Sequence, residues 1–179
     1  TAVFYSISNC QKGLKGISFG NFLIKQVANA IRTDYPNIKD FVTLSPVPGF
    51  MNWLELNNNE LFKSIDNGQF MNETDEYKDD ILKNSLDYFF NSERSDKLPN
   101  DSVARFHLGN GAYLHRINFL GDLSNKALNS AAGLMVNYKY DLDKIEENHE
   151  EFFKEKNIIC SNEIQLMKKN YHKKKFKFG

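Results

Sequence analysis

The chain has 179 residues, of which 41% are hydrophobic and 13% aromatic, enough apolar mass for one globular domain with a sizeable core. Its 23 lysine and arginine residues balance 23 aspartate and glutamate residues, so no overall field favours nucleic acid as a partner. No apolar run approaches the ~20 residues that span a bilayer, so no membrane segment is predicted. Cys10 and Cys160 lack CxxC spacing, which favours reduced thiols over a disulfide framework or a zinc site.

The first 45 residues predict a strand, a helix and a second strand. Residues 2–8 alternate and are rich in β-branched and aromatic side chains, which is typical of a strand. Pro36 ends the helix that follows, and residues 40–45 form the next strand. The helix is indicated by apolar residues at helical spacing, namely Gly20, Leu23, Ile24, Val27, Ala28 and Ile31. A βαβ unit implies two parallel strands, with a ligand site expected at their C-terminal ends.

A glycine-containing loop, NCQKGLKGISFG, connects the first strand to this helix. Gly13, Gly16 and Gly20 allow close approach of the backbone, and the helix N-terminus offers unpaired amides, so phosphate is the natural ligand. The loop has neither the Gly-Lys-Ser/Thr ending of a nucleotide triphosphate loop nor the spacing of a dinucleotide fingerprint. Glycines used only for turns and packing are therefore the alternative interpretation.

The second strand ends in the segment FVTLSPVPGF, which holds Ser45 in a stiff backbone. Pro46 drives the preceding residue toward extended geometry, and Pro46 and Pro48 fix their own φ angles. A rigid hydroxyl of this kind suits the orientation of a substrate. The alternative is a serine that merely ends a strand before a turn.

The segment 57–97 is acidic and rich in asparagine, and its apolar periodicity is weak outside residues 81–90. We therefore expect a largely exposed surface insertion, whose removal would leave the site intact. A short helix is expected immediately before it, over residues 50–56.

His107 is the second polar candidate. A short helix over residues 102–106 is expected to precede the loop formed by residues 107–111, HLGNG, which begins with this imidazole. A satisfied, partly buried histidine is the alternative to a functional one. No HExxH, GxSxG or carboxylate cluster points to a metallohydrolase or a serine hydrolase.

The remaining elements are expected to complete the fold. Residues 112–119 fit either a strand or a helix, and residues 133–140 read as a strand. Residues 143–169 are expected to form one final helix, and the lysine-rich stretch 168–177 suits its C-terminus. Such a basic end is usually solvated, so we do not assign it to nucleic-acid binding.

Four blocks carry a resemblance to a known family: FYSISNCQKGLKGISFGNFLIKQV, TLSPVPGF, VARFHLGNGAYLHRINFLGDLS and GLMVNYKYDL. In this order they resemble the C-terminal catalytic part of malonyl-CoA decarboxylase, covering most of residues 1–56 and 98–142. That family is similar in fold to the GCN5-related acetyltransferases. The resemblance therefore implies an α/β (α+β) fold, a mixed sheet with flanking helices. Because family members are longer, we expect residues 1–179 to be one partial catalytic domain, a C-terminal portion of the whole.

The resemblance also implies site residues. Ser45 and His107 match the active-site serine and histidine, and Tyr140 falls where the family has a tyrosine near the site. The malonyl-CoA-binding loop of the family is matched by Lys15, Gly16, Ile17, Ser18, Phe19, Gly20 and Asn21. Ser18 departs from the family pattern, which has glutamate there, so this chain lacks that carboxylate.

The implied activity is that of a carbon–carbon lyase of fatty-acid metabolism, converting malonyl-CoA to acetyl-CoA and CO2. Neither a cofactor nor a metal is required. Ser45 would orient the leaving carboxylate, and His107 would donate the proton to the carbanion. The alternatives are an acyl-CoA-dependent acyltransferase and a non-catalytic acyl-CoA-binding module. The resemblance further implies a homo-oligomer, and an intracellular location in mitochondria, peroxisomes or the cytosol.

Overall fold

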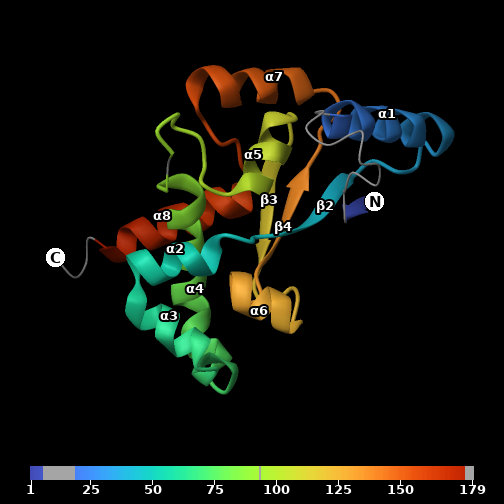
Figure 1. The fold of residues 1–179 in the computed structure, drawn as a ribbon. Coiled ribbons are helices and arrows are strands. Elements are labelled where there is room, and N and C mark those ends of the chain that lie inside the picture. The colour runs from blue at the N-terminus through green and yellow to red at the C-terminus, as the bar shows by residue number, and fades with distance from the viewer. Residues whose placement is uncertain (6–18, 93, 176–179) are drawn as a thin grey trace.

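The structure is a computed structural model that describes residues 1–5, 19–92 and 94–175. Within these ranges a four-stranded sheet forms the centre of the molecule, in the order β1-β2-β4-β3 (Figure 1). The strands are β1 (Ala2–Tyr5), β2 (Phe41–Pro46), β3 (Tyr113–Asn118) and β4 (Met135–Lys139). β1 is parallel to β2, whereas β4 is antiparallel to both β2 and β3. The mixed α/β class expected from the sequence is confirmed.

Helices flank this sheet. In Figure 1, α1 and α7 lie together at one end of the molecule, and α3 lies at the opposite end. The α-helices are α1 (Phe19–Asp34), α2 (Phe50–Asn57), α3 (Asn59–Asp66), α4 (Thr74–Phe90), α5 (Ser102–Gly109), α6 (Asn125–Ala131), α7 (Ile145–Glu150) and α8 (Asn162–Lys175). A 3-10 turn, η2 (Gln69–Met71), and a π-helical turn, η3 (Glu151–Glu155), complete the list of helical elements in the described ranges.

The predicted βαβ unit is present as β1, α1 and β2. The parallel register aligns Ala2 with Phe41 at one end, and α1 connects the two strands. Of the predicted apolar stripe on α1, Ile24 and Ala28 are buried, one helical turn apart, while Leu23 and Val27 stay exposed. Ile31 is partly buried against the core, so the buried face is narrower than the sequence spacing predicts.

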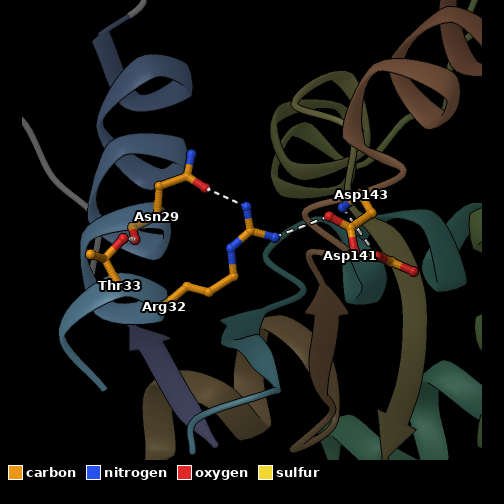
Figure 2. Close-up of polar contacts among 5 residues, drawn as sticks. All are labelled: Asn29, Arg32, Thr33, Asp141 and Asp143. Carbon is orange, nitrogen blue, oxygen red and sulfur yellow. Dashed lines mark hydrogen bonds and ion pairs between the residues drawn. The ribbon is translucent and has the colours of Figure 1, made fainter. Parts of the chain in front are cut away.

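Charged side chains tie α1 to the chain beyond β4 (Figure 2). Arg32 Nη1 donates to Asp143 Oδ1 at 3.0 Å, while its Nη2 donates to Asn29 Oδ1 at 3.4 Å. Lys25 Nζ also lies 2.8 Å from Glu146 Oε1, at the start of α7. These pairs are largely exposed, so solvent screens them and their contribution to stability is small. The two ion pairs orient α1 toward α7.

The segment 57–97 is not the largely exposed surface that we expect from its composition. It folds into α3, η2 and α4, and seven of its apolar side chains are buried in the core: Leu61, Ile65, Phe70, Ile81, Leu86, Tyr88 and Phe89. Acidic and amide residues fill many of the exposed positions in this segment, which makes its apolar periodicity look weak. Burial of these side chains makes α3 and α4 part of the domain core.

Two expectations for the second half of the chain are also settled. Residues 112–119 contain strand β3, not a helix. The single helix expected over residues 143–169 is wrong, because Lys156 adopts a left-handed backbone with φ 56° and ends the helical run. The chain then runs beside β3, where Leu114 N–H donates to Ile159 O, and α8 starts afterwards. Among the described helices, none combines the length and apolar character needed to cross a membrane.

Candidate active site

Ser45 lies near the end of β2 on its buried face. Alternation along the strand places Phe41, Thr43 and Ser45 on one side of the sheet, and all three are buried. The register pairs Ser45 with Val136 of β4, next to the pair formed by Pro46 and Met135. The hydroxyl is therefore held by a paired strand as well as by the proline that follows.

His107 lies in the last turn of α5, not in the loop that we expect after residue 106. The helix continues to Gly109 and ends in a left-handed turn at Gly111, with φ 81°. The N–H of Ala112 donates to His107 O, and the N–H of Gly111 donates to Leu108 O, which is the bonding pattern of a Schellman C-cap. The glycines therefore close the helix that carries His107.

The structure brings three of the predicted site residues together. Ser45 Oγ lies 3.2 Å from His107 Nε2, although sixty-two positions separate the two residues. His107 Nδ1 lies 2.9 Å from the hydroxyl of Tyr140, which follows β4. Both ring nitrogens thus have a hydroxyl partner. On its other side, Ser45 Oγ lies 2.9 Å from Thr43 Oγ1, so the four side chains form a continuous hydrogen-bonded chain.

Burial determines the protonation states of the hydrogen-bonded side chains. Ser45 and His107 each expose only 4% of their surface. Burial lowers the pKa of the His107 imidazole to about 4, because the charged form loses its hydration. Burial also raises the pKa of Tyr140, and the nearby Asn110 side chain opposes that rise. At neutral pH the site therefore holds a neutral imidazole between two neutral hydroxyls.

Tyr88, from the segment 57–97, contacts both the helix that bears His107 and the loop after Ser45. The Tyr88 hydroxyl donates to Asp101 Oδ2 at 3.2 Å, and Asp101 Oδ1 accepts the Ala104 N–H at 2.7 Å as the N-cap of α5. The same hydroxyl lies 2.5 Å from where a Cβ on Gly49 would be, just beyond Ser45 in the chain. Tyr88 thus contacts the helix that bears His107 and the loop that follows Ser45.

The malonyl-CoA-binding loop expected from the resemblance lies mostly outside the described residues. This applies to Lys15, Gly16, Ile17 and Ser18. Phe19, Gly20 and Asn21 belong to the first turn of α1. The prediction that this loop binds the ligand stays a prediction.

Three further residues of the site were not predicted. Thr43 lies two residues before Ser45, and strand alternation alone could have placed it on the same face. Tyr138 stacks on His107 with ring centroids 4.8 Å apart. Among the described residues, neither the Tyr138 hydroxyl nor Asn110 Nδ2 has a hydrogen-bond partner, although both atoms are buried. No group of three or more His, Cys, Asp or Glu side chains suited to a metal occurs in the described ranges.

Acid is expected to destabilise the fold through His107. The unfolded imidazole takes up a proton near pH 6.5, but the buried one does so only near pH 4, so the unfolded state binds more protons between these values. This contribution to stability is present above pH 6.5 and is lost as the pH falls, by about 3 kcal/mol at pH 4. Urea unfolding at pH 7 and pH 4.5 measures it, with His107→Asn as the control. An equally steep pH dependence in the variant would contradict this assignment.

The fold and the site define a class of protein: a mixed α/β domain with a buried serine–histidine–tyrosine chain suited to moving a proton at a bound substrate. A family model described as "Malonyl-CoA decarboxylase C-terminal domain" matches residues 1–177. The chain therefore belongs to the malonyl-CoA decarboxylase family.

Individual relatives agree with this membership. The mitochondrial malonyl-CoA decarboxylase of Anser anser anser is 36% identical over 199 residues, covering 92% of this chain and 39% of that protein. Its counterpart in Rattus norvegicus is 34% identical over 195 residues, covering 91% and 40%. Crystal structures of malonyl-CoA decarboxylase from Rhodopseudomonas palustris and Agrobacterium vitis match with TM-scores of 0.83 and 0.84, at 44% and 45% identity. They cover 92% of this chain and 41% and 44% of theirs, so the chain spans about two fifths of its relatives' length.

Proposed function

We propose that the protein decarboxylates malonyl-CoA to acetyl-CoA and CO2. The observation that carries the proposal is the 3.2 Å contact between Ser45 Oγ and His107 Nε2 inside a buried chain of hydroxyls. These are the two residues that match the active-site serine and histidine of the family. Membership of that family supplies the substrate, and the geometry supplies groups able to act on it.

The reaction breaks one carbon–carbon bond and makes one carbon–hydrogen bond. As CO2 leaves, the electron pair of the broken bond passes into the thioester as an enolate, and a proton then adds to the carbon. Catalysis requires the carboxylate to be held out of the plane of the thioester carbonyl, so that the electron pair of the breaking bond can pass into the carbonyl π system. The Ser45 hydroxyl, fixed by β2 and Thr43, donates to the carboxylate and sets this orientation.

His107 supplies the proton in this proposal. Burial gives this imidazole a pKa of about 4, which keeps it neutral at pH 7. A malonyl carboxylate entering the buried site places a negative charge beside the ring, which raises the pKa and favours uptake of a proton. The imidazolium then donates that proton to the carbanion. Tyr140 holds the ring in place through Nδ1 while Nε2 faces Ser45.

The loop of residues 15–21 is proposed to bind the CoA pyrophosphate with its backbone amides, as expected of a glycine-containing segment that leads into a helix N-terminus. Gly16→Val is expected to raise KM more than it lowers kcat, because a side chain there would block close approach of the phosphates. Steady-state kinetics together with a direct measurement of CoA affinity check this. Unchanged CoA affinity would exclude the loop as the pyrophosphate site.

The function is tested by incubating the full-length protein with malonyl-CoA and following acetyl-CoA in a coupled assay. Stoichiometric acetyl-CoA and CO2 are the expected products. Consumption of an acyl-CoA only when an amine acceptor is added would instead identify an acyltransferase. Binding of malonyl-CoA without any turnover would identify a non-catalytic module.

A further inference from the structure

Thr43 occupies a fixed position at the inner end of the hydrogen-bonded chain. Its side chain is fully buried, on the strand face that also carries Ser45. Thr43 Oγ1 has two partners: the backbone N–H of Tyr138 at 3.0 Å, and Ser45 Oγ at 2.9 Å. Asn137 Nδ2 additionally donates to the backbone carbonyl of Thr43 at 2.6 Å, so β4 holds this residue through both its main chain and its side chain.

The two partners of the threonine hydroxyl are not equivalent. A backbone N–H can only donate, so Thr43 Oγ1 must accept from Tyr138. Its own hydrogen is then left to donate, and within the described residues the available partner is Ser45 Oγ. The reverse direction, with Ser45 donating to Thr43, would leave a fully buried hydroxyl hydrogen unpaired, which is unfavourable.

The outer end of the chain imposes no such direction. The Asn110 side chain lies near Tyr140, and its buried Nδ2 has no hydrogen-bond partner among the described residues. An amide offers an acceptor at one atom and donors at the other. Rotation of that amide can therefore satisfy the Tyr140 hydroxyl whichever way the hydrogen bonds run. Only the Thr43 end, anchored on a backbone amide, can decide the direction.

We propose that Thr43 is a positioning residue that directs the hydrogen bonds of the site from Tyr138 N–H through Thr43 and Ser45 to His107. In this arrangement Thr43 donates to Ser45, Ser45 donates to His107 Nε2, and His107 therefore carries its own proton on Nδ1, facing Tyr140. The Ser45 hydroxyl is thus already a directed donor before substrate arrives. The catalytic consequence rests on the proposed decarboxylation, whereas the direction of the hydrogen bonds does not.

The tautomer of His107 is the readout that a purely structural role would not change. In the full-length protein, ¹⁵N NMR at pH 7 distinguishes a protonated from an unprotonated imidazole nitrogen, and His107→Asn assigns the signal. The wild type is expected to show hydrogen on Nδ1 and a free Nε2. Thr43→Val, which keeps the shape but has no hydroxyl, is expected to shift the population toward the tautomer protonated on Nε2. Thr43→Ser should restore the wild-type pattern.

Kinetics provide the second readout. Thr43→Val is expected to lower kcat about 3- to 10-fold, the equivalent of one neutral hydrogen bond, with KM for malonyl-CoA changed less than about twofold. Thr43→Ser should recover most of the loss. A wild-type His107 protonated on Nε2 would overturn the proposal even if Thr43→Val does not fold, as would wild-type kcat in a folded Thr43→Val. If the wild type fails to decarboxylate malonyl-CoA, the proposed function falls, while the NMR result still decides the role of Thr43.

Discussion

His107→Asn is expected to lower kcat for malonyl-CoA by roughly 10²-fold or more, while binding of CoA stays nearly unchanged. General acid catalysis by a positioned side chain is typically worth that much, and asparagine can keep a polar contact but cannot carry the proton. The imidazole is held from both sides, by Ser45 at Nε2 and by Tyr140 at Nδ1, so its removal disrupts the whole chain. Steady-state kinetics and a separate CoA-binding measurement check the two halves of the expectation.

Ser45→Ala is the matched comparison at the other side of the same contact. It should also lower kcat, but with more residual activity, because a hydroxyl that only orients the carboxylate is less costly to lose than the proton donor. Near-normal kcat in His107→Asn would remove this residue from the chemistry. Equal losses in both variants would instead make serine and histidine act as one unit.

Gly111→Ala is expected to destabilise the protein by about 3 to 5 kcal/mol. Gly111 has φ 81°, and a Cβ there would overlap the carbonyl oxygen of Ile145 and lie 2.8 Å from its Cγ2. Alanine is strained in this left-handed backbone conformation, and its Cβ also forces α7 away from the end of α5. Because Gly111 closes the helix that carries His107, activity should fall together with stability.

Gly68→Ala is the control for this effect. Gly68 has a similar φ of 78°, but a Cβ there would meet no atom within 4 Å. This variant should lose only about 1 kcal/mol, the cost of the left-handed conformation itself. Denaturant unfolding of both variants compares them directly. If Gly111→Ala were no less stable than Gly68→Ala, α7 would be able to move away from Gly111 without a loss in the free energy of unfolding.

The elements that sequence reasoning predicted are those whose signals are local. The βαβ unit follows from alternation, from helical spacing and from the proline that ends α1, and each of these acts within a few residues. Ser45 was recognisable because Pro46 restricts its backbone and Pro48 stiffens the segment that follows. The motif around His107 identified the residue but not its helix, because the glycines at 109 and 111 suggested a loop. Gly109 is in fact the last residue of α5, and Gly111 is the left-handed residue that follows the C-cap.

The errors arise where long-range packing decides. Composition made the segment 57–97 look solvated, yet Ile81 and Phe89 of α4 are buried against the rest of the core. Likewise, the helical pattern of residues 143–169 did not reveal the left-handed Lys156, which lets the chain turn back to pair beside β3. Such outcomes depend on partners that are distant in the sequence.

The site shows the same division. The family resemblance named Ser45, His107 and Tyr140, but the hydrogen bonds between them come from three separate elements meeting in space. Thr43 has no motif signature, since a threonine in a strand is an ordinary β-former. Only the antiparallel pairing with β4, which presents the Tyr138 amide to it, gives that side chain a role.

The position of Tyr88 also bears on how this domain can be re-engineered. The Tyr88 hydroxyl donates to the N-cap residue of α5 and also lies close to Gly49. The serine motif and the histidine motif therefore both pack against α4, which carries no motif of its own. A chimera that grafts the serine and histidine motifs onto another scaffold must therefore bring α4 with them. By the same reasoning, α4 is a poor place to insert a tag or a reporter, although its sequence is hydrophilic.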